Sequence, residues 1–599
     1  MRTLLTPFLL APLLLPLGAC EQPAAPTEAD AAADLILYNA RVYTLAWEDP
    51  SGEGLPAPGA PRDDAGWHPD AQAVAIRGDR ITYVGDTEHA LTLADDDTQR
   101  IDLQGTTLLP GLVDSHTHVF NLGAALSRVN LRDVASEAEA VALVAERAAQ
   151  VPEGEWIIGQ GWDEGAWADR YPDKRLLSEA VPTHPVFMRS LHSFAGWVNQ
   201  AALDRLEITG RTEVPSGGEM RLGADGEPTG LFLNRAVPLV EDAIPPASRA
   251  ERTRQVMEAM CQMAQDGYVT VHDAGINGEE LQILEQLEAD GRLPLRVYAM
   301  LSAREKPLSR EWLAKGPQTL TAPDQRLAVR SIKAFYDGAL GSRGARLLQD
   351  YADRPGHRGV SGSQYGFDEA LVEDLMRAGF QVGVHAIGDA GNRETLNFFQ
   401  RVIESSPVAA QGRHRIEHAQ VLHPQDLPRL AELGIIASME PPHAVEDKTW
   451  AETRLGPQRI RGAYAWRSLR ESGAQLVFNA DNPGSDHNIF YGLHAAVTRR
   501  DKNRQPPEGW YPEEAVTMDE ALRAYSRWAA YASFREAQTG LLAEGRWADL
   551  TALTIDPFVV ADTAPGDLLE GGIRLTVVGG EVTYDSTVQS AGNCGAPAR

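Results

Sequence analysis

The chain has 599 residues, 43% of them hydrophobic and 23% charged, a composition that is typical of a folded globular protein and excludes an intrinsically disordered one. This length exceeds that of one ordinary domain. The formal net charge of −29 excludes nucleic acid as an expected partner, because phosphate binding requires a basic surface.

Residues 1–19 are predicted to be a signal peptide. Arg2 precedes an apolar run, 4–17, that is shorter than a membrane span. The run ends in Leu17-Gly18-Ala19-Cys20, which resembles the bacterial lipobox, whose cysteine is lipidated and becomes the mature N-terminus. We therefore predict an exported lipoprotein, anchored through Cys20 to a bacterial membrane on its periplasmic or cell-surface side. Residues 20–33, which are acidic and rich in Ala and Pro, are the predicted tether.

Both ends of the mature chain carry strand patterns separated by turn residues. The predicted strand runs are 35–45, 73–84, 100–109, 548–553 and 573–584. Gly579–Gly580 reads as a hairpin turn within the last of them. We predict that residues 34–107 and 540–586 form one small β-sandwich domain, with a larger unit inserted between them.

The larger unit, residues 108–539, alternates short apolar runs with helix-like segments. The runs are 108–114, 268–273, 295–301, 328–335, 380–385, 413–418, 435–439 and 475–481. This alternation predicts a parallel (β/α)8, or TIM-like, barrel of the α/β class. Helical periodicity at 368–378 and 394–403 supports it. The first two runs are too far apart for one crossover helix, so we predict an insertion at about 130–257 that forms a lid over the barrel mouth.

Residue types that bind metal ions lie at the ends of these runs, where a barrel of this kind places its reactive side chains. His116 and His118 are two apart on an extended segment, so both imidazoles point to one side and can reach one ion. His385, His418 and Asp481 end the fifth, sixth and eighth runs. Lys333 lies within the fourth run, where burial of a free ammonium would be costly.

Seven motifs extend this pattern along the chain. They are PGLVDSHTH (110–118), GQGWDE (159–164), VTVHDAG (269–275), IKAFYDGALGSRGA (332–345), VHAIGDAGN (384–392), RIEHAQ (415–420) and GLLAEGRWADL (540–550). Together they resemble the amidohydrolase superfamily of metal-dependent barrels, in its amidohydrolase 3 branch, and are similar to N-substituted formamide deformylases. The eighth-strand motif departs from the family's Gly-Ser-Asp-x-Pro: here it reads Asn479-Ala480-Asp481-Asn482-Pro483, with Asp486 as a nearby competitor.

The resemblance implies a divalent metal, zinc by preference, bound as one or two ions. His116 and His118 would hold one ion. His385 and His418 would hold the other. Lys333, carboxylated by CO2, would bridge them; an uncarboxylated Lys333 beside a single ion is the alternative.

Asp481 has a double role in the reaction that the resemblance implies. It would belong to the metal site, and it would orient a metal-activated water, take its proton and pass that proton to the leaving amine. Four residues are candidates for substrate contact: His192, Trp162, Arg343 and His272. Arg343 has the alternative role of fixing its own loop, and Trp162 that of packing. For His272, as for its neighbour Asp273 at the end of the second run, the alternative to substrate contact is core hydrogen bonding. Glu417 is interpreted as a residue that orients a metal ligand, and Glu440 and His443 as further residues near the pocket.

We interpret the chain as a hydrolase that cleaves a C–N bond, other than a peptide bond, of a small molecule. The resemblance favours linear amides, such as an N-acyl or N-formyl amine. A cyclic amidase or a dipeptidase-like enzyme on the same centre is one alternative, and a small-molecule-binding lipoprotein without catalysis is another. The resemblance also implies a homodimer.

Overall fold

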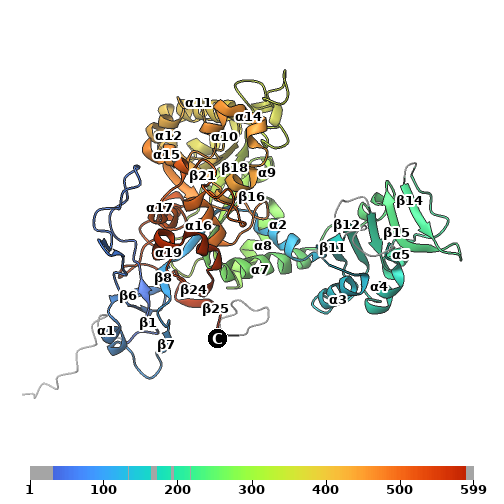
Figure 1. The fold of residues 1–599 in the computed structure, drawn as a ribbon, viewed down its shortest axis with the longest axis horizontal. Helices are drawn as coiled ribbons and strands as arrows, with labels where there is room; N and C mark the ends of the chain where they lie inside the picture. The colour runs from blue at the N-terminus through green and yellow to red at the C-terminus, as the bar shows by residue number, and fades with distance from the viewer. Residues whose placement is uncertain (1–31, 133, 163–170, 191–194, 216–217, 589–599) are drawn as a thin grey trace, which may run out of the picture.

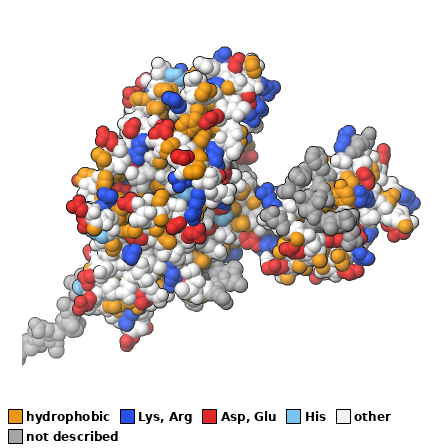
Figure 2. Space-filling model, viewed as in Figure 1, with side chains coloured by type: hydrophobic (Ala, Val, Ile, Leu, Met, Phe, Trp, Pro, Cys, Tyr) orange, Lys and Arg blue, Asp and Glu red, His pale blue; other side chains and the backbone are white. Residues whose placement is uncertain are grey.

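The computed structural model describes residues 32–132, 134–162, 171–190, 195–215 and 218–588. The predicted signal peptide, the lipidation site Cys20, most of the tether and His192 lie outside the described residues. Within those ranges, no helix is both long enough and apolar enough to cross a membrane. Acidic and basic side chains are interspersed over the face seen in Figure 2.

Eight parallel strands form the central sheet, in the order β22-β21-β20-β19-β18-β17-β16-β9. They are β9 (Leu112–Thr117), β16 (Tyr268–Ile276), β17 (Arg296–Ser302), β18 (Leu327–Phe335), β19 (Gln381–Ala386), β20 (Arg415–His418), β21 (Ile436–Met439) and β22 (Gln475–Phe478). The two outer strands meet where the Ser115 hydroxyl donates to the Phe478 carbonyl at 2.8 Å. The sheet is therefore a nearly closed TIM-like barrel (Figure 1), which confirms the predicted fold class.

The barrel strands are almost entirely buried, because helices cover their outer faces. These helices include α8 (Gly278–Ala289), α9 (Lys306–Lys315), α10 (Glu369–Arg377), α11 (Asp389–Ser405), α12 (Leu427–Leu433), α15 (Trp466–Glu471) and α16 (Ile489–Thr498). In α10, Asp368 caps the first turn by accepting from the Leu371 amide at 3.3 Å, and the buried residues recur at helical spacing. Helices α10 and α11 lie where the apolar periodicity predicts them.

Two small sheets lie at the chain ends. One has the order β6-β5-β1-β7, and the other, β2-β8-β23-β24-β25, joins strands from both ends. Their strands are β1 (Leu35–Tyr38), β2 (Arg41–Val42), β5 (Ala73–Arg77), β6 (Arg80–Gly85), β7 (Gln99–Asp102), β8 (Thr107–Pro110), β23 (Leu550–Leu553), β24 (Ile573–Val578) and β25 (Glu581–Asp585). Leu37, Ile76 and Leu550 belong to one apolar cluster shared by the two sheets. The two chain ends thus combine around one core.

The predicted first barrel strand, 108–114, is in fact two strands in different sheets. β8 ends at Pro110 in the terminal sheet, and β9 begins at Leu112 in the barrel. Gly111 joins them at a place without room for a side chain, because a Cβ there would lie 2.4 Å from the Val269 side chain. The apolar run is continuous because both strands are buried, so hydrophobicity alone does not mark the break.

A buried ion pair joins the barrel to the sheet β2-β8-β23-β24-β25, which contains strands from both chain ends. Arg296, at the start of β17, donates through Nε to Oδ2 of Asp549 at 2.8 Å and through Nη2 to Oδ1 at 2.9 Å. Both side chains are 1% exposed. Asp549 Oδ1 also accepts from the Gly579 amide at 2.8 Å. Burial alone would raise the pKa of Asp549, yet Arg296 holds it below its usual value.

Replacing Asp549 with asparagine is expected to lower the free energy of unfolding by about 3 kcal/mol, because Arg296 would remain buried without its counter-charge. A fall in the midpoint of urea denaturation at pH 7 would show this. The carboxylate's contribution is present above its unfolded pKa of about 3.9 and is lost as the pH falls through the lower folded pKa. Asp567→Asn is the control, since its pair with Arg504 is exposed and contributes less than about 1 kcal/mol. Equal midpoints for the two variants would contradict the prediction.

A separate lobe lies between β9 and β16. Its sheet has the order β10-β11-β12-β13-β15-β14. The lobe consists of β10 (Val129–Asn130), α3 (Glu137–Ala148), β11 (Ile157–Trp162), α4 (Lys174–Ala180), β12 (Val186–Ser190), β13 (Ala195–Val198), α5 (Gln200–Arg205), β14 (Gly218–Leu222), β15 (Pro228–Asn234) and α6 (Pro238–Glu241). Its two apolar clusters contain only lobe residues. Where a lid was expected, the structure has a lobe that stands apart from the barrel (Figure 1).

The lobe is joined to the barrel at a neck formed by α2 (Val119–Leu126) and α7 (Arg249–Gln265). The helices approach closely at Gly123, where a Cβ would lie 2.1 Å from the Gln255 carbonyl oxygen. Arg147 of the lobe also pairs with Glu258 of α7 at 2.9 Å. Because the lobe has its own cores and few ties to the barrel, the barrel alone supplies the frame of the candidate site.

Candidate metal centre

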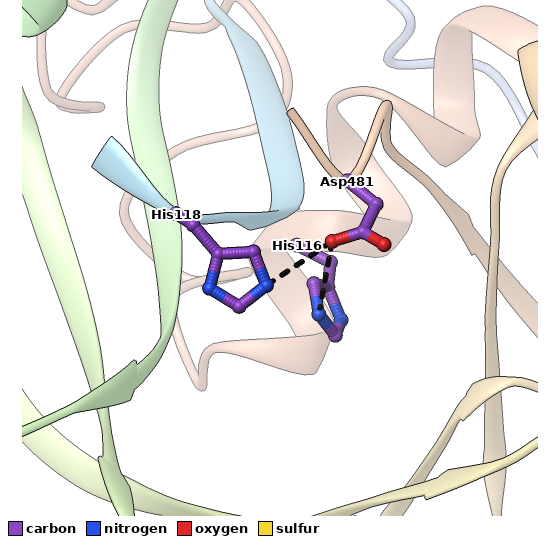
Figure 3. A group of neighbouring side chains, drawn as sticks. All are labelled: His116, His118 and Asp481. Atoms are coloured by element: carbon purple, nitrogen blue, oxygen red, sulfur yellow. Dashed lines mark ion pairs between the residues drawn. The ribbon is translucent and has the colours of Figure 1, made fainter. Parts of the chain in front are cut away.

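The end of β9 places two imidazoles on one side of the strand, as the two-residue spacing predicts. His116 Nε2 lies 3.6 Å from Oδ1 of Asp481, and His118 Nε2 lies 3.2 Å from the same oxygen. Figure 3 shows both rings directed toward this carboxylate. The ligand atoms of the three residues all lie within 4.8 Å of one another, which makes them a candidate metal site.

The other predicted ligands adjoin this group. Lys333, on β18 and 1% exposed, places Nζ 2.9 Å from His116 Nε2. The His418 ring centroid lies 5.2 Å from that of His116 and 4.5 Å from that of His385. Five strands, β9, β18, β19, β20 and β22, therefore bring all six predicted residues to one end of the barrel: His116, His118, Lys333, His385, His418 and Asp481.

Glu417 orients His116 through the ring nitrogen that faces away from the metal centre. Its Oε2 lies 2.5 Å from His116 Nδ1, so this carboxylate favours the tautomer with hydrogen on Nδ1 and leaves the Nε2 lone pair facing the centre. Arg415 donates to Glu417 at 2.8 Å and to the Ser115 carbonyl at 2.6 Å. Burial would raise the pKa of Glu417, but the charges of Arg415 and His116 hold it well below its usual range.

A second acid holds His418. Glu440 Oε2 lies 3.2 Å from His418 Nδ1 and 3.5 Å from His443 Nδ1, and these three residues form a second group with metal-ligand geometry. Burial opposes ionisation, but the two histidines lower the pKa of Glu440 to about 2. Glu440 in turn raises the pKa of His443 to about 9 against the effect of burial. Glu440 and His443 thus lie next to the centre, where the sequence analysis expected residues of the pocket.

The side chains fit a divalent cation. Among the described residues, His385 Nε2 is buried and lacks a hydrogen-bond partner, although buried polar atoms normally have one. Burial and the nearby Lys333 lower the pKa of His116 to about 4, and burial, followed by His418, lowers that of His385 well below its usual value. Neutral imidazoles beside a carboxylate are the donor set that zinc and similar ions prefer.

The altered eighth-strand motif still directs Asp481 into the centre. The side-chain oxygen of Asn479 accepts from the Asp481 amide at 3.1 Å, and the His116 carbonyl accepts from the same amide at 3.1 Å. The Asn482 carbonyl accepts from the His118 amide at 3.0 Å. Asp481 has a φ of 47°, a strained conformation that persists where its surroundings enforce it. Asp486 instead lies outside this group and pairs with Lys502.

The residues predicted to contact substrate have different surroundings in the structure, and they do not converge on one site as the predicted metal ligands do. His272 is fully buried in β16 and accepts from Arg415 Nη1 at 3.0 Å, in agreement with its alternative role in the core. Arg343 donates to Asp353 through Nε at 3.1 Å and Nη2 at 2.7 Å, which fixes its own loop. Trp162 is buried in an apolar cluster of the lobe and donates to the Met188 carbonyl at 2.9 Å, so the structure places it in the lobe interior.

Sequence reasoning gave no role to Arg415, although it links Glu417, His272 and β9. A signal was present: Arg415 and Glu417 are two apart on a strand and so share the inward face with their neighbours. A charged pair inside an apolar strand requires buried partners, which here come from other strands. Asp273, for which the sequence left core hydrogen bonding and substrate contact open, is a buried acid on β16.

The fold and the site define a barrel hydrolase with a candidate His/Asp metal centre. The model of the amidohydrolase family matches residues 99–584, and the chain belongs to this family. It is 32% identical over 501 residues to the putative amidohydrolase YtcJ of Bacillus subtilis, covering 82% of this chain and 91% of that protein. It is 27% identical to N-substituted formamide deformylase of Arthrobacter pascens, covering 86% and 95%. The crystal structure of an uncharacterized metal-dependent hydrolase from Pyrococcus furiosus is similar, with a TM-score of 0.65, 26% identity and coverage of 88% and 99%.

Proposed function

We propose that this protein hydrolyses a C–N bond of a small linear amide, such as an N-acyl or N-formyl amine, and depends on a divalent metal, zinc by preference. The observation that carries the proposal is the convergence of the histidines, Lys333 and Asp481 at the C-terminal end of the barrel, with unpartnered donor atoms. One relative that the chain matches over most of its length, N-substituted formamide deformylase, has a name that states a substrate class and supports a linear amide.

A divalent ion bound by these residues would lower the pKa of a water molecule and polarise the amide carbonyl. Asp481 is the base. Burial would raise its pKa, but the hydrogen bond to His118 and the charges of the nearby histidines hold it well below its usual value, so it is ionised at neutral pH. Its Oδ1 faces the Nε2 atoms of His118 and His116, at 3.2 and 3.6 Å, on the side of the candidate metal site. It can therefore take a proton from the attacking water and give it to the leaving nitrogen.

Lys333 is proposed to react with CO2 and become the anionic ligand between two ions. Burial lowers the pKa of Lys333, which increases the fraction of neutral amine. The neutral Nζ would form a bond to the carbon of CO2 while one C=O π bond opens onto its oxygen, and the proton lost from Nζ would pass to water, which yields a carbamate. The side chain of Lys333, which is positive as an ammonium, would be negative as a carbamate. A negatively charged ligand is the kind that favours binding of cations.

The test is a hydrolysis assay with chelator-treated and zinc-reloaded protein. The panel holds N-formyl and N-acetyl alkylamines, cyclic imides and hydantoins, and dipeptides. We expect turnover of the linear amides that disappears with the chelator and returns with zinc. Preference for the cyclic compounds or the dipeptides would replace the proposed substrate class. Zinc binding without turnover of any compound would favour a binding protein without catalysis.

A further inference from the structure

A small polar pocket lies beside the metal centre, between the ends of β9 and β16. It has a volume of about 150 Å³. Its polar lining consists of His118, Asn121, Asp273, Asn277 and Glu280. Pockets that enclose a whole drug-sized ligand are at least about 300 Å³, so this one has room for a single functional group. Because His118 also belongs to the metal group, the same small molecule can occupy both places.

Asp273 is the acid in this pocket that lacks a full set of partners. It is 3% exposed, and its Oδ1 accepts from the Val119 amide at 3.2 Å. Its Oδ2 is buried without a partner among the described residues. A carboxylate taken out of water without a counter-charge is costly. In agreement, burial, with a contribution from the negative charge of Glu280, raises the pKa of Asp273 well above its usual value.

The comparison with Asp337 shows that burial alone does not explain an unpartnered oxygen. Asp337 is also a fully buried acid that follows a barrel strand, β18. Its two oxygens accept from the backbone amides of Arg346 at 2.8 Å, Ile387 at 2.9 Å and Gly388 at 2.9 Å. Asp337 is thus satisfied by its own loops, whereas Asp273 has one oxygen left for a group from outside.

The other acid of the pocket is already engaged. Glu280 accepts from Arg252 at 2.7 Å and from the backbone amide of Asn277 at 2.9 Å. The side-chain oxygen of Asn277 accepts from two amides at the start of α8, both at 3.0 Å. Asp273 Oδ2 is therefore the acidic atom of the pocket without a partner among the described residues, and no lysine or arginine belongs to the pocket lining there.

We propose that this pocket binds a protonated amino group of the substrate, so that the preferred amides carry an ammonium a few bonds from the scissile C–N bond. The inference rests on the proposed amide hydrolysis and specifies its substrate class. An ammonium in the pocket donates to Asp273 Oδ2 and supplies the missing counter-charge, which makes a charge-assisted hydrogen bond. Asp273 is a specificity-determining residue in this arrangement.

The test compares two substrates of matched length, N-formyl-1,4-diaminobutane and N-formylpentylamine, with the zinc-loaded wild-type protein and with Asp273→Asn. The wild type is expected to favour the charged formamide in kcat/KM by at least about tenfold, since a hydrogen bond to a charged group contributes more than its neutral counterpart. In the variant that preference is expected to disappear, because kcat/KM for the charged formamide falls further than kcat/KM for the neutral one. The asparagine retains the acceptor for the Val119 amide, so a purely structural role would lower both values alike. Equal losses, or no preference in the wild type, would overturn the proposal.

A binding measurement separates this inference from the proposed hydrolysis. Calorimetric titration with n-butylammonium and with n-butanol is expected to detect binding of the ammonium alone, lost in Asp273→Asn and kept in the control Asp486→Asn, whose carboxylate is half-buried and pairs with Lys502. Charge-selective binding without turnover of any formamide would refute the hydrolysis and leave the subsite standing. Equal binding of the two probes, or binding of neither, would overturn the subsite. Stoichiometric Ca2+ binding that depends on Asp273 would overturn it in favour of a cation site.

Discussion

Replacing Asp481 with asparagine is expected to lower kcat for amide hydrolysis by roughly 10²–10⁴-fold, the contribution of a positioned general base. The asparagine has nearly the same shape but does not accept a proton at neutral pH. Its backbone contacts to Asn479 and His116 do not involve the carboxylate, so the loop is expected to keep its position. Initial rates over a range of substrate concentrations, with the metal content of each preparation measured, would separate lost proton transfer from lost metal.

Asp486→Asn is the matched control, because it makes the same substitution five positions along the chain. Asp486 pairs with Lys502 and accepts from the Asn488 amide at 2.9 Å, outside the metal group. We expect its activity to remain near that of the wild type. Loss of activity in Asp486→Asn with retention in Asp481→Asn would move the base to Asp486. If the wild type shows no turnover and Asp481→Asn binds ligand as well as the wild type, the protein is a binder.

The features that the sequence predicted share a local cause. A barrel strand is a short apolar run, and the residue type at its end is visible in the same few letters, so His385 and His418 could be assigned to strand ends without knowledge of their neighbours. His116 and His118 needed only the period of two that any strand has. The fold class followed because eight such runs alternate with helical patterns.

The features that the sequence did not predict depend on residues distant in the chain. Arg415 contacts the Ser115 carbonyl 300 positions away, and no local pattern contains that pair. The break at Gly111 was hidden because strands of two different sheets follow each other within one apolar run. For Trp162 the sequence left substrate contact and packing open, because its burial depends on the lobe having a hydrophobic core of its own.

The metal centre and the pocket beside His118 show opposite uses of buried charge. Glu417 and Arg415 satisfy each other inside the barrel and so hold His116 in one orientation. Asp273, in contrast, has an oxygen without a partner among the described residues. An arginine and a carboxylate that pair with each other hold a metal ligand in place, whereas an acid without a counter-charge beside them gives a place where a ligand gains a contact that the protein alone does not make.

Replacing Lys333 with alanine is expected to lower the bound zinc from about two equivalents to one or fewer and to lower kcat by about 10³-fold. This loss corresponds to about 4 kcal/mol, at a factor of ten for each 1.36 kcal/mol. The reason is the position of Lys333, whose Nζ lies 2.9 Å from His116 Nε2 in a site that has no other buried lysine among its described residues. Elemental analysis of the purified protein gives the stoichiometry, and a carbamate signal in ¹³C NMR after equilibration with ¹³C-bicarbonate reports the modification directly.

The matched control is Lys315→Ala, since Lys315 is an exposed helical lysine paired with Glu311 and touches no predicted ligand. It is expected to keep the wild-type metal content, activity and NMR signal. One equivalent of metal in both the wild type and Lys333→Ala, with no carbamate signal, would make Lys333 a structural residue beside a single ion. In that case there would be no second ion to bridge, and Asp481 would act with His116 and His118 alone, as their shared contact to its Oδ1 already allows.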